Sequence, residues 1–302
     1  MTPCPAAHLT PSRALLLACL YGLGACAGAP ATESAQAAAE RLYLEGMEQM
    51  QSAAFLEAQQ SFQEVMKMPA YLSVTAIARL RLADALYHQQ RNDQAIEAYM
   101  AYATRHDGAS NVPYARFMVA KSFFEMVPSD FWLLPPVFEM DLSAVDKARA
   151  RLERFVRRYP LSAYVTEAQA LRDRCVALQL QQHAYVVRFY VERKQWLSVV
   201  FRLHHTMSEF PARAHTLANY QQLAQAYELL NWRGRALVLQ QTITRRWPGT
   251  PGAAAAAVRA ADLRNTIARA KAGGEANAEM PKELPPTASV HPETMTVTQL
   301  GD

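Results

Sequence analysis

Two adjacent histidines, His204 and His205, are the side chains of this sequence whose type and spacing most suggest metal binding. Neighbouring residues of a helix point about 100° apart, so these two rings cannot readily share one ion. The motifs of common enzymes are missing, since the sequence has no Gly-x-Ser-x-Gly, no phosphate-binding glycine loop and no His-Glu-x-x-His. A hydrolase site within residues 128–141 is not expected either, because that segment has no histidine or cysteine to act as base or nucleophile. We therefore expect a protein that is not an enzyme and that holds no metal or soluble cofactor.

Cys26 is the residue that we expect to react covalently. It ends a stretch in which a positive charge is followed by the eleven-residue apolar run 14–24. That run is too short to span a bilayer as a helix and fits the core of a signal peptide over residues 1–25. The sequence Leu23-Gly24-Ala25-Cys26 resembles the bacterial lipobox, which implies that Cys26 is acylated and becomes the first mature residue. An ordinary secretory signal with an incidental cysteine is the alternative.

The lipid implied at Cys26 would hold the protein on a membrane, because two or more acyl chains suffice for stable anchoring. Position 27 is alanine and not the aspartate that commonly retains such lipoproteins at the inner membrane. The resemblance thus implies an outer-membrane lipoprotein of a Gram-negative bacterium, facing the periplasm. The other cysteines, Cys4, Cys19 and Cys175, provide no disulfide framework, and we expect Cys175 to be a small buried side chain.

The charge of the chain argues against nucleic acid as a partner. The formal net charge is +4 at pH 7, and no basic helix is interleaved with aromatic residues. The charge is unevenly placed, because residues 231–271 hold eight basic side chains against Asp262 alone, whereas residues 272–302 hold five acids against Lys282 alone. The basic end is either a solvated surface followed by a solubilising tail or a docking site for an acidic partner.

The centre of the chain repeats itself. The small residues Gly46, Ala83 and Ala120 follow one another at intervals of 37 residues, and Ala58 and Ala95 repeat the same interval. Small residues at such positions let two amphipathic helices approach closely while larger apolar residues interlock around them. Three later segments end in an aromatic residue and a proline, which cannot continue a helix: Tyr159-Pro160, Phe210-Pro211 and Trp247-Pro248. This pattern resembles the tetratricopeptide repeat, whose usual period is 34 residues.

We therefore predict an all-α fold, a tetratricopeptide-repeat solenoid of five helix hairpins, in which each hairpin buries its apolar face against its neighbours. A lipidated tether over residues 26–37 precedes the array, and a disordered acidic tail over residues 272–302 follows it. The predicted repeats are about 38–70, 72–107, 112–160, 162–211 and 214–248, with a closing helix over 251–271.

Two segments break the period. Ala120 and Ala148 are separated by 28 residues where Ala83 and Ala95 are separated by twelve, so sixteen residues are inserted in the third repeat. The fourth repeat begins with a stretch from Ser162 to Trp196 that has no glycine or proline. We predict that this stretch forms one helix, about four turns longer than its neighbours.

These features together resemble the BamD family, the lipoprotein subunit of the β-barrel assembly machinery. The matching segments are residues 115–124 before the insertion, residues 148–164 after it and residues 184–190 on the long helix, and the resemblance covers roughly residues 38–271. The run Arg158-Tyr159-Pro160, with Ser162 and Tyr164, is its most specific part. The fourth repeat departs from the family by having fewer alanines, and the acidic tail is longer than the family needs.

The resemblance implies a periplasmic scaffold that docks on the periplasmic domains of a BamA-like barrel protein, joins accessory lipoproteins and receives unfolded outer-membrane proteins. In tetratricopeptide arrays the first helix of each hairpin lines a concave groove, and such a surface of aromatic and methionine side chains suits an extended apolar peptide, with Lys121 pairing a carboxylate. Aromatic stripes at helical spacing are also typical of a core. The groove positions carried onto this sequence are Tyr43, Met47, Met50, Asp84, Tyr87, Tyr114, Phe117, Lys121 and Phe124.

The docking surface for the barrel protein is expected at the basic C-terminal repeats, and its candidate residues are Arg202, Trp232, Arg233, Arg235, Arg245 and Arg246. An alternative function is a tetratricopeptide-repeat lipoprotein that scaffolds cell-wall or envelope complexes. Such a protein would share the anchor and the array, but it would not need the insertion or the long helix.

Overall fold

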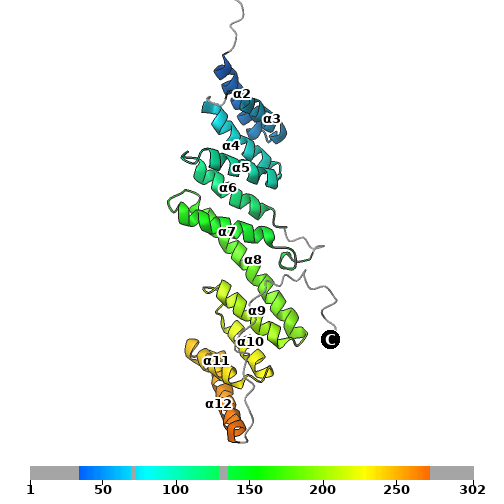
Figure 1. The fold of residues 1–302 in the computed structure, drawn as a ribbon, viewed down its shortest axis with the longest axis vertical. Coiled ribbons are helices and arrows are strands. Elements are labelled where there is room, and N and C mark those ends of the chain that lie inside the picture. The colour runs from blue at the N-terminus through cyan, green and yellow to red at the C-terminus, as the bar shows by residue number, and fades with distance from the viewer. Residues whose placement is uncertain (1–33, 70–72, 129–134, 273–302) are drawn as a thin grey trace, which may run out of the picture. The chain divides into compact units, whose positions relative to one another are not determined.

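The computed structural model describes residues 34–69, 73–128 and 135–272, and all secondary structure in these ranges is helical (Figure 1). The predicted all-α fold with helix hairpins in tetratricopeptide order is therefore confirmed. The elements are α2 (Ala35–Gln51), α3 (Phe55–Lys67), α4 (Ser73–His88), α5 (Asn92–Arg105), α6 (Val112–Glu125), the short 3-10 helix η1 (Val137–Glu139), α7 (Ser143–Arg158), α8 (Val165–Glu192), α9 (Trp196–Glu209), α10 (Leu217–Leu229), α11 (Arg233–Arg246) and α12 (Pro251–Ala272).

The chain divides into two compact units, residues 1–89 and residues 90–302. The first holds α2 to α4, and the second holds α5 to α12 with η1. The predicted signal peptide, Cys26 and the predicted acidic tail after residue 272 lie outside the described residues, as does the segment 129–134 of the insertion. In the described ranges, no helix combines the length and the apolar character that crossing a membrane requires.

The first unit is a three-helix layer in which α2 packs on α3, α3 on α4 and α2 on α4. Helix α2 begins at Ala35, before the predicted start at residue 38, because the Ser34 hydroxyl caps it by accepting a hydrogen bond from the Ala37 amide at 3.2 Å. Gly46 lies in the centre of the unit against Phe62, whose ring is fully buried. Gly46, which was predicted to let two helices approach closely, thus lies at a close contact between α2 and α3.

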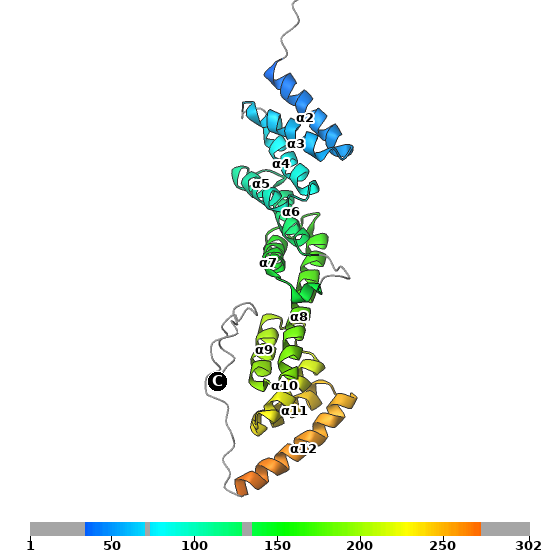
Figure 2. The same ribbon diagram turned by 90° about the vertical axis from the view of Figure 1, so that its right-hand side faces the viewer.

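In the second unit each helix packs on the next one along the chain, and α6 also packs on α8. Figure 2 shows α8 running from the neighbourhood of α7 to that of α9. It has 28 residues, against 16 in α7 and 14 in α9. At 1.5 Å per residue it is about 42 Å long. The predicted long helix is confirmed, although it begins and ends a few residues inside the predicted stretch.

The turns inside the hairpins share one unusual backbone conformation. Ala53, Gln90, Lys194 and Asn231 all have φ between 56° and 60°, in the left-handed region. Thirty-seven residues separate Ala53 from Gln90 and Lys194 from Asn231, which is the interval of the sequence repeat. In three of these turns the amide that follows the left-handed residue bonds to the carbonyl five residues back: Ala54 to Gln49 at 2.8 Å, Gln195 to Tyr190 at 2.9 Å and Trp232 to Tyr227 at 2.8 Å. This is the Schellman motif that ends helices, here built without glycine.

The two irregular segments of the sequence meet in the structure. The described part of the insertion forms η1, which packs on α8. The Phe138 and Tyr185 rings lie 5.8 Å apart, Val137 is buried, and the Gln182 side chain donates a hydrogen bond to the Met140 carbonyl at 3.5 Å. The additional length of α8 thus provides the surface that the insertion covers.

Candidate functional site

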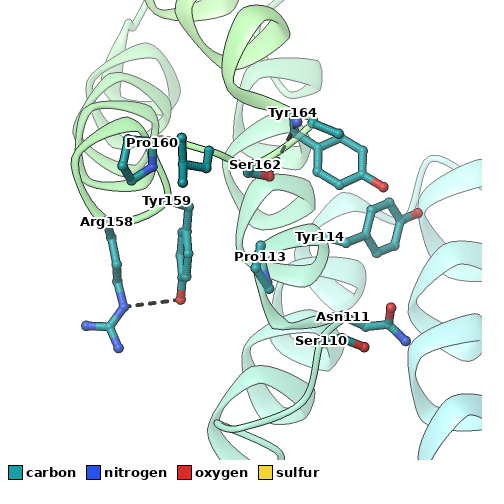
Figure 3. Close-up of a pocket in the computed structure, with 11 residues that line it drawn as sticks. Ser110, Asn111, Pro113, Tyr114, Arg158, Tyr159, Pro160, Ser162 and Tyr164 are labelled. Carbon is teal, nitrogen blue, oxygen red and sulfur yellow. Dashed lines mark hydrogen bonds between the residues drawn. The ribbon is translucent and has the colours of Figure 1, made fainter.

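An open cleft of about 520 Å³ lies where the start of α6 faces the connection between α7 and α8 (Figure 3). One wall comes from residues 110–114 and the other from residues 158–164. The second wall contains the run Arg158-Tyr159-Pro160, with Ser162 and Tyr164, that carries the family resemblance. The most specific part of the sequence therefore forms a surface and not only a core.

Local turn chemistry shapes this wall. Helix α7 ends at Arg158, two residues before Pro160. The chain then turns through a hydrogen bond from the Ser162 amide to the Tyr159 carbonyl at 3.1 Å, and the Ser162 hydroxyl accepts a hydrogen bond from the Tyr164 amide at 3.3 Å. This turn places Leu161 outward with 99% of its side chain exposed. A fully exposed leucine at the rim adds an apolar contact surface to the cleft.

Aromatic rings continue from the cleft into the core. Figure 3 shows Tyr114 and Tyr164 next to each other on one side, with Tyr159 and Arg158 on the other. The Tyr114 and Tyr164 rings are 5.5 Å apart, and Tyr164 stacks on Phe117 at 5.2 Å with an angle of 12° between the planes. Such packing fixes the tyrosine rings while their outer edges remain partly exposed.

Arg158 gives the cleft a positive charge. Its Nε donates a hydrogen bond to the Tyr159 hydroxyl at 3.1 Å, and this bond raises the pKa of the guanidinium above its ordinary value. The side chain is exposed, so the charge can reach a ligand in solvent. An apolar and aromatic cleft with one cation at its rim suits an extended peptide with large apolar side chains and a carboxylate.

Of the groove residues predicted in the third repeat, Tyr114 lines this cleft. Phe117 and Phe124 are 2% and 8% exposed, so they belong to the core. The prediction that these two rings line an exposed groove is therefore wrong. Helix α6 packs on α5, α7 and α8, with Phe117 against Phe155 of α7 and the Arg174 guanidinium of α8 over the Phe124 ring. The Lys121 ammonium forms an ion pair with Glu167 of α8 at 2.8 Å, so the carboxylate it meets belongs to the protein.

The groove residues predicted in the first unit are also partly enclosed. Tyr43, Met47 and Met50 are half-buried and pack against the core cluster that contains Phe62. Asp84 was predicted to line the groove, but it is 4% exposed and forms an ion pair with Arg81 inside the unit. Tyr87, on the next turn of α4, is half-buried with its ring against His88 at 5.5 Å.

The predicted docking residues separate into exposed and buried groups. Arg235, Arg245 and Arg246 are exposed on α11, and Arg233 is half-buried. Trp232 was predicted to belong to the docking surface, but it is 8% exposed and packs on Tyr227, with the ring centroids 5.7 Å apart.

Arg202, on α9, is also largely enclosed, and burial lowers the pKa of its guanidinium. Its Nε is buried without a hydrogen-bond acceptor among the described residues. Of the predicted docking residues, those that are exposed are Arg235, Arg245 and Arg246 of α11.

The adjacent histidines point in different directions, as the geometry of a helix requires. His204 Nε2 lies 2.6 Å from the Tyr227 hydroxyl of α10, whereas His205 Nε2 lies 3.4 Å from Glu209 Oε2 on its own helix. His183 of α8 joins His205 and Glu209, which the sequence did not indicate because 22 residues separate the two histidines. Cys175 is fully buried as predicted, and burial raises the pKa of its thiol to about 12, so the thiol is unreactive.

The profile of the family YfiO, described as outer membrane lipoprotein, matches residues 35–236, which is more than half of the chain. The chain belongs to this family of outer membrane lipoproteins. Within the matched range lie the cleft, the insertion and the long helix α8, whereas Arg245 and Arg246 lie beyond it.

Two curated relatives of this YfiO family chain carry the name outer membrane protein assembly factor BamD. The protein from Caulobacter vibrioides is 23% identical over 219 residues, which cover 72% of this chain and 69% of the relative. The protein from Xylella fastidiosa is also 23% identical over 219 residues, which cover 70% of this chain and 73% of the relative. The resemblance to the BamD family stated from the sequence is thereby confirmed.

Solved structures of tetratricopeptide-repeat proteins are also similar to this chain, with lower sequence identity than the two relatives. The TPR2AB-domain:pHSP90 complex of yeast Sti1 aligns with a TM-score of 0.39 and 12% identity over 78% of this chain and 86% of that one. A tetratricopeptide-repeat protein from Parabacteroides merdae aligns with a TM-score of 0.33 and 12% identity over 78% of this chain and 87% of that one.

Proposed function

We propose that this protein is a non-catalytic periplasmic scaffold of the outer-membrane β-barrel assembly machinery. The observation that carries the proposal is the family match over residues 35–236, together with two relatives named as outer-membrane protein assembly factors. A role in outer-membrane protein assembly follows from that family. A solenoid built from helix hairpins supports it physically, because such arrays provide long surfaces for binding other chains.

The proposed anchor is a lipid on Cys26, which attaches the chain to the periplasmic face of the outer membrane. The sequence around Cys26 supports it, because a basic start, a short apolar run and Leu23-Gly24-Ala25 precede the cysteine. A Cys26→Ser variant should move from the membrane fraction to the soluble periplasm. Membrane association equal to that of the unmodified protein would disprove the lipid anchor.

The proposed substrate site is the cleft lined by Tyr114, Tyr159 and Tyr164, with Arg158 and Leu161 at its rim. Its aromatic walls and single cation suit a strand of an unfolded outer-membrane protein that has large apolar side chains and a terminal carboxylate. Strands of β-barrels alternate apolar and polar side chains, so one face of an extended segment can contact the rings while the other stays in water.

The proposed docking surface for the periplasmic domains of a BamA-like barrel protein is the exposed arginine set Arg235, Arg245 and Arg246. Charges at an interface rim favour association with an acidic partner and make its rate depend on salt. Accessory lipoproteins would join the same assembly.

A pull-down with the native protein in gentle detergent tests the assignment. We expect it to recover a large outer-membrane barrel protein with periplasmic domains. Recovery of cell-wall enzymes in its place would support the alternative of an envelope scaffold and would overturn the proposed function.

A further inference from the structure

Three side chains with metal-binding atoms converge between α8 and α9. His183 Nε2 lies 3.6 Å from Glu209 Oε2, and His205 Nε2 lies 3.4 Å from the same oxygen. All three atoms lie within 4.8 Å of one another. His205 and Glu209 share one face of α9 because they are four residues apart, and the hairpin turn brings His183 opposite them.

These separations are close to those of a tetrahedral metal site. Ligand atoms that lie 2.0–2.2 Å from a zinc ion at tetrahedral angles are about 3.3 to 3.6 Å from one another. Two sides of the triangle, at 3.4 Å and 3.6 Å, therefore fit with little movement. The third side, between the two histidine nitrogens, is no longer than 4.8 Å and would have to shorten by rotation of His205, whose side chain is 42% exposed.

Hydrogen bonds fix the tautomer of His183. The Thr206 hydroxyl donates its hydrogen to the Arg202 carbonyl at 2.7 Å, so towards His183 it can only accept. His183 Nδ1, which lies 2.7 Å from the same oxygen, must then carry the ring hydrogen. In the neutral ring this leaves the Nε2 lone pair directed at the Glu209 carboxylate.

A lone pair that faces a carboxylate oxygen is repulsive unless a proton or a metal ion lies between them. His183 is 6% exposed, so water screens this contact poorly. A metal ion in this place would bind both atoms and remove the repulsion. Histidines that bind metals usually donate their other ring hydrogen to an acceptor, as His183 does to Thr206.

The surroundings also orient the carboxylate. The Arg149 guanidinium donates a hydrogen bond to Glu209 Oε1 at 2.8 Å, which leaves Oε2 for the histidines. Arg149 partly neutralises Glu209 and so lowers the affinity for any cation. Two imidazoles with one carboxylate bind zinc-like transition ions, whereas magnesium and calcium prefer sites made only of oxygen.

We propose that His183, His205 and Glu209 form a binding site for one divalent transition-metal ion of the zinc type. The ion joins α8 to α9 inside the fourth repeat. The partly exposed His205 leaves the cluster accessible to solvent. The site lies in the family-matched range but does not depend on the proposed substrate or docking surfaces.

The test uses the mature full-length chain without a polyhistidine tag, treated with EDTA and then dialysed. Calorimetric titration with Zn²⁺ should show one ion bound per chain, and Co²⁺ should develop the visible absorption of a tetrahedral site. The His205→Gln variant should bind Zn²⁺ at least about tenfold more weakly, since losing a ligand should cost no less than losing a partner that orients one. Because His205 is partly exposed, this variant should keep the circular dichroism spectrum of the unmodified protein.

His88→Gln, at an exposed histidine of α4 in the other unit, is the matched control and should bind Zn²⁺ as the unmodified protein does. Mg²⁺ and Ca²⁺ should not compete. Absence of Zn²⁺ binding to the unmodified chain would overturn the proposal. Equal Zn²⁺ affinity of the His205→Gln and His88→Gln variants would overturn it as well, because the bound ion would then lie elsewhere.

Discussion

Gly46 of α2 faces the ring of Phe62 of α3 so closely that a Cβ atom at position 46 would lie 2.6 Å from Phe62 Cε1. Real Cβ atoms do not approach other heavy atoms at this distance, and Phe62 is fully buried, so its ring has little room to move. The contact sets how closely α2 and α3 approach each other.

Gly46→Ala should destabilise the first unit. Alanine gains about 1 kcal/mol of helix propensity over glycine, but overpacking a core costs about 1–3 kcal/mol. The expected net loss is about 1 kcal/mol in the free energy of unfolding, measured by urea denaturation. Gly234→Ala on α11 is the matched control, because nothing lies within 4 Å of a Cβ atom there, and it should be neutral or stabilising. Equal effects of the two substitutions would contradict the packing argument.

The left-handed turns predict a pair of stabilising substitutions. Lys194 has φ of 56°, a conformation that costs a residue with a Cβ about 1 kcal/mol or more relative to glycine. Lys194→Gly should therefore raise the unfolding free energy by about 1 kcal/mol. Asn231→Gly should gain less, because asparagine tolerates this conformation better than lysine does. Thermal unfolding of both variants measures the difference, and a larger gain at position 231 would count against this explanation.

The buried His183 predicts a loss of stability in acid. Burial, together with Arg202, His205 and Arg149, lowers the pKa of His183 to about 3 from an ordinary value of 6.5. Between these two values the unfolded chain binds a proton that the folded chain does not, so stability falls as the pH falls from 6.5 towards 3. At pH 5 the resulting loss in unfolding free energy is about 2 kcal/mol. This loss applies to the part of the array that unfolds together with α8.

Urea midpoints of EDTA-treated protein at neutral pH and at pH 5 measure this effect. A His183→Gln variant cannot bind the proton, so its midpoint should fall less between the two pH values. His88→Gln, at an exposed histidine of the other unit, serves as the control and should lose stability as the unmodified protein does. If His183→Gln and the unmodified protein lost stability equally, His183 would not be the group responsible.

The rim of the cleft predicts how a peptide ligand is held. Arg158→Glu combined with Leu161→Asp changes two exposed side chains and should leave the helices intact. Binding of a fluorescent peptide with alternating aromatic residues and a free carboxyl terminus should weaken by roughly fivefold or more, since an exposed ion pair and an apolar contact are each worth up to about 1 kcal/mol. Arg157→Glu, which changes an exposed neighbour outside the cleft lining, should have a smaller effect. Amidation of the peptide should abolish the contribution of Arg158.

The exposed arginines of α11 predict that binding to the proposed barrel partner depends on charge. Arg235→Glu combined with Arg245→Glu should weaken binding to its purified periplasmic domains by at least about fivefold, with the largest loss at low salt. The control carries the same charge change on α12, at the exposed Arg264 and Arg269. Equal weakening in both variants would show that the overall charge of this end matters and that α11 has no special role.

Much of the architecture could be predicted from the sequence because the interval of the sequence repeat is also the interval at which the backbone turns recur. The interval that joins Gly46 to Ala83 also separates the left-handed residues of the turns, Ala53 from Gln90 and Lys194 from Asn231. The long helix was predictable because nothing in its sequence could end it.

Exposure at the candidate sites was harder to predict. Phe117 and Phe124 have the spacing of a groove, but α6 is covered by three other helices, and a periodic pattern cannot show how many neighbours a helix has. The exposure of Trp232 was also predicted wrongly. This residue follows the left-handed Asn231, and its side chain turns inward onto Tyr227. The cluster around Glu209 joins residues of two helices, and no single segment of the sequence contains it.

The length of α8 also determines which parts of the array can open independently. Glu167 and Gln179 of α8 bond to Lys121 of α6 and Asp146 of α7, and His183 further along bonds to Thr206 of α9. No irregular residue interrupts the helix between Val165 and Glu192. Opening of either neighbouring hairpin therefore exposes part of the same helix. In hydrogen-exchange experiments the third and fourth repeats should behave as one cooperative segment and not as two.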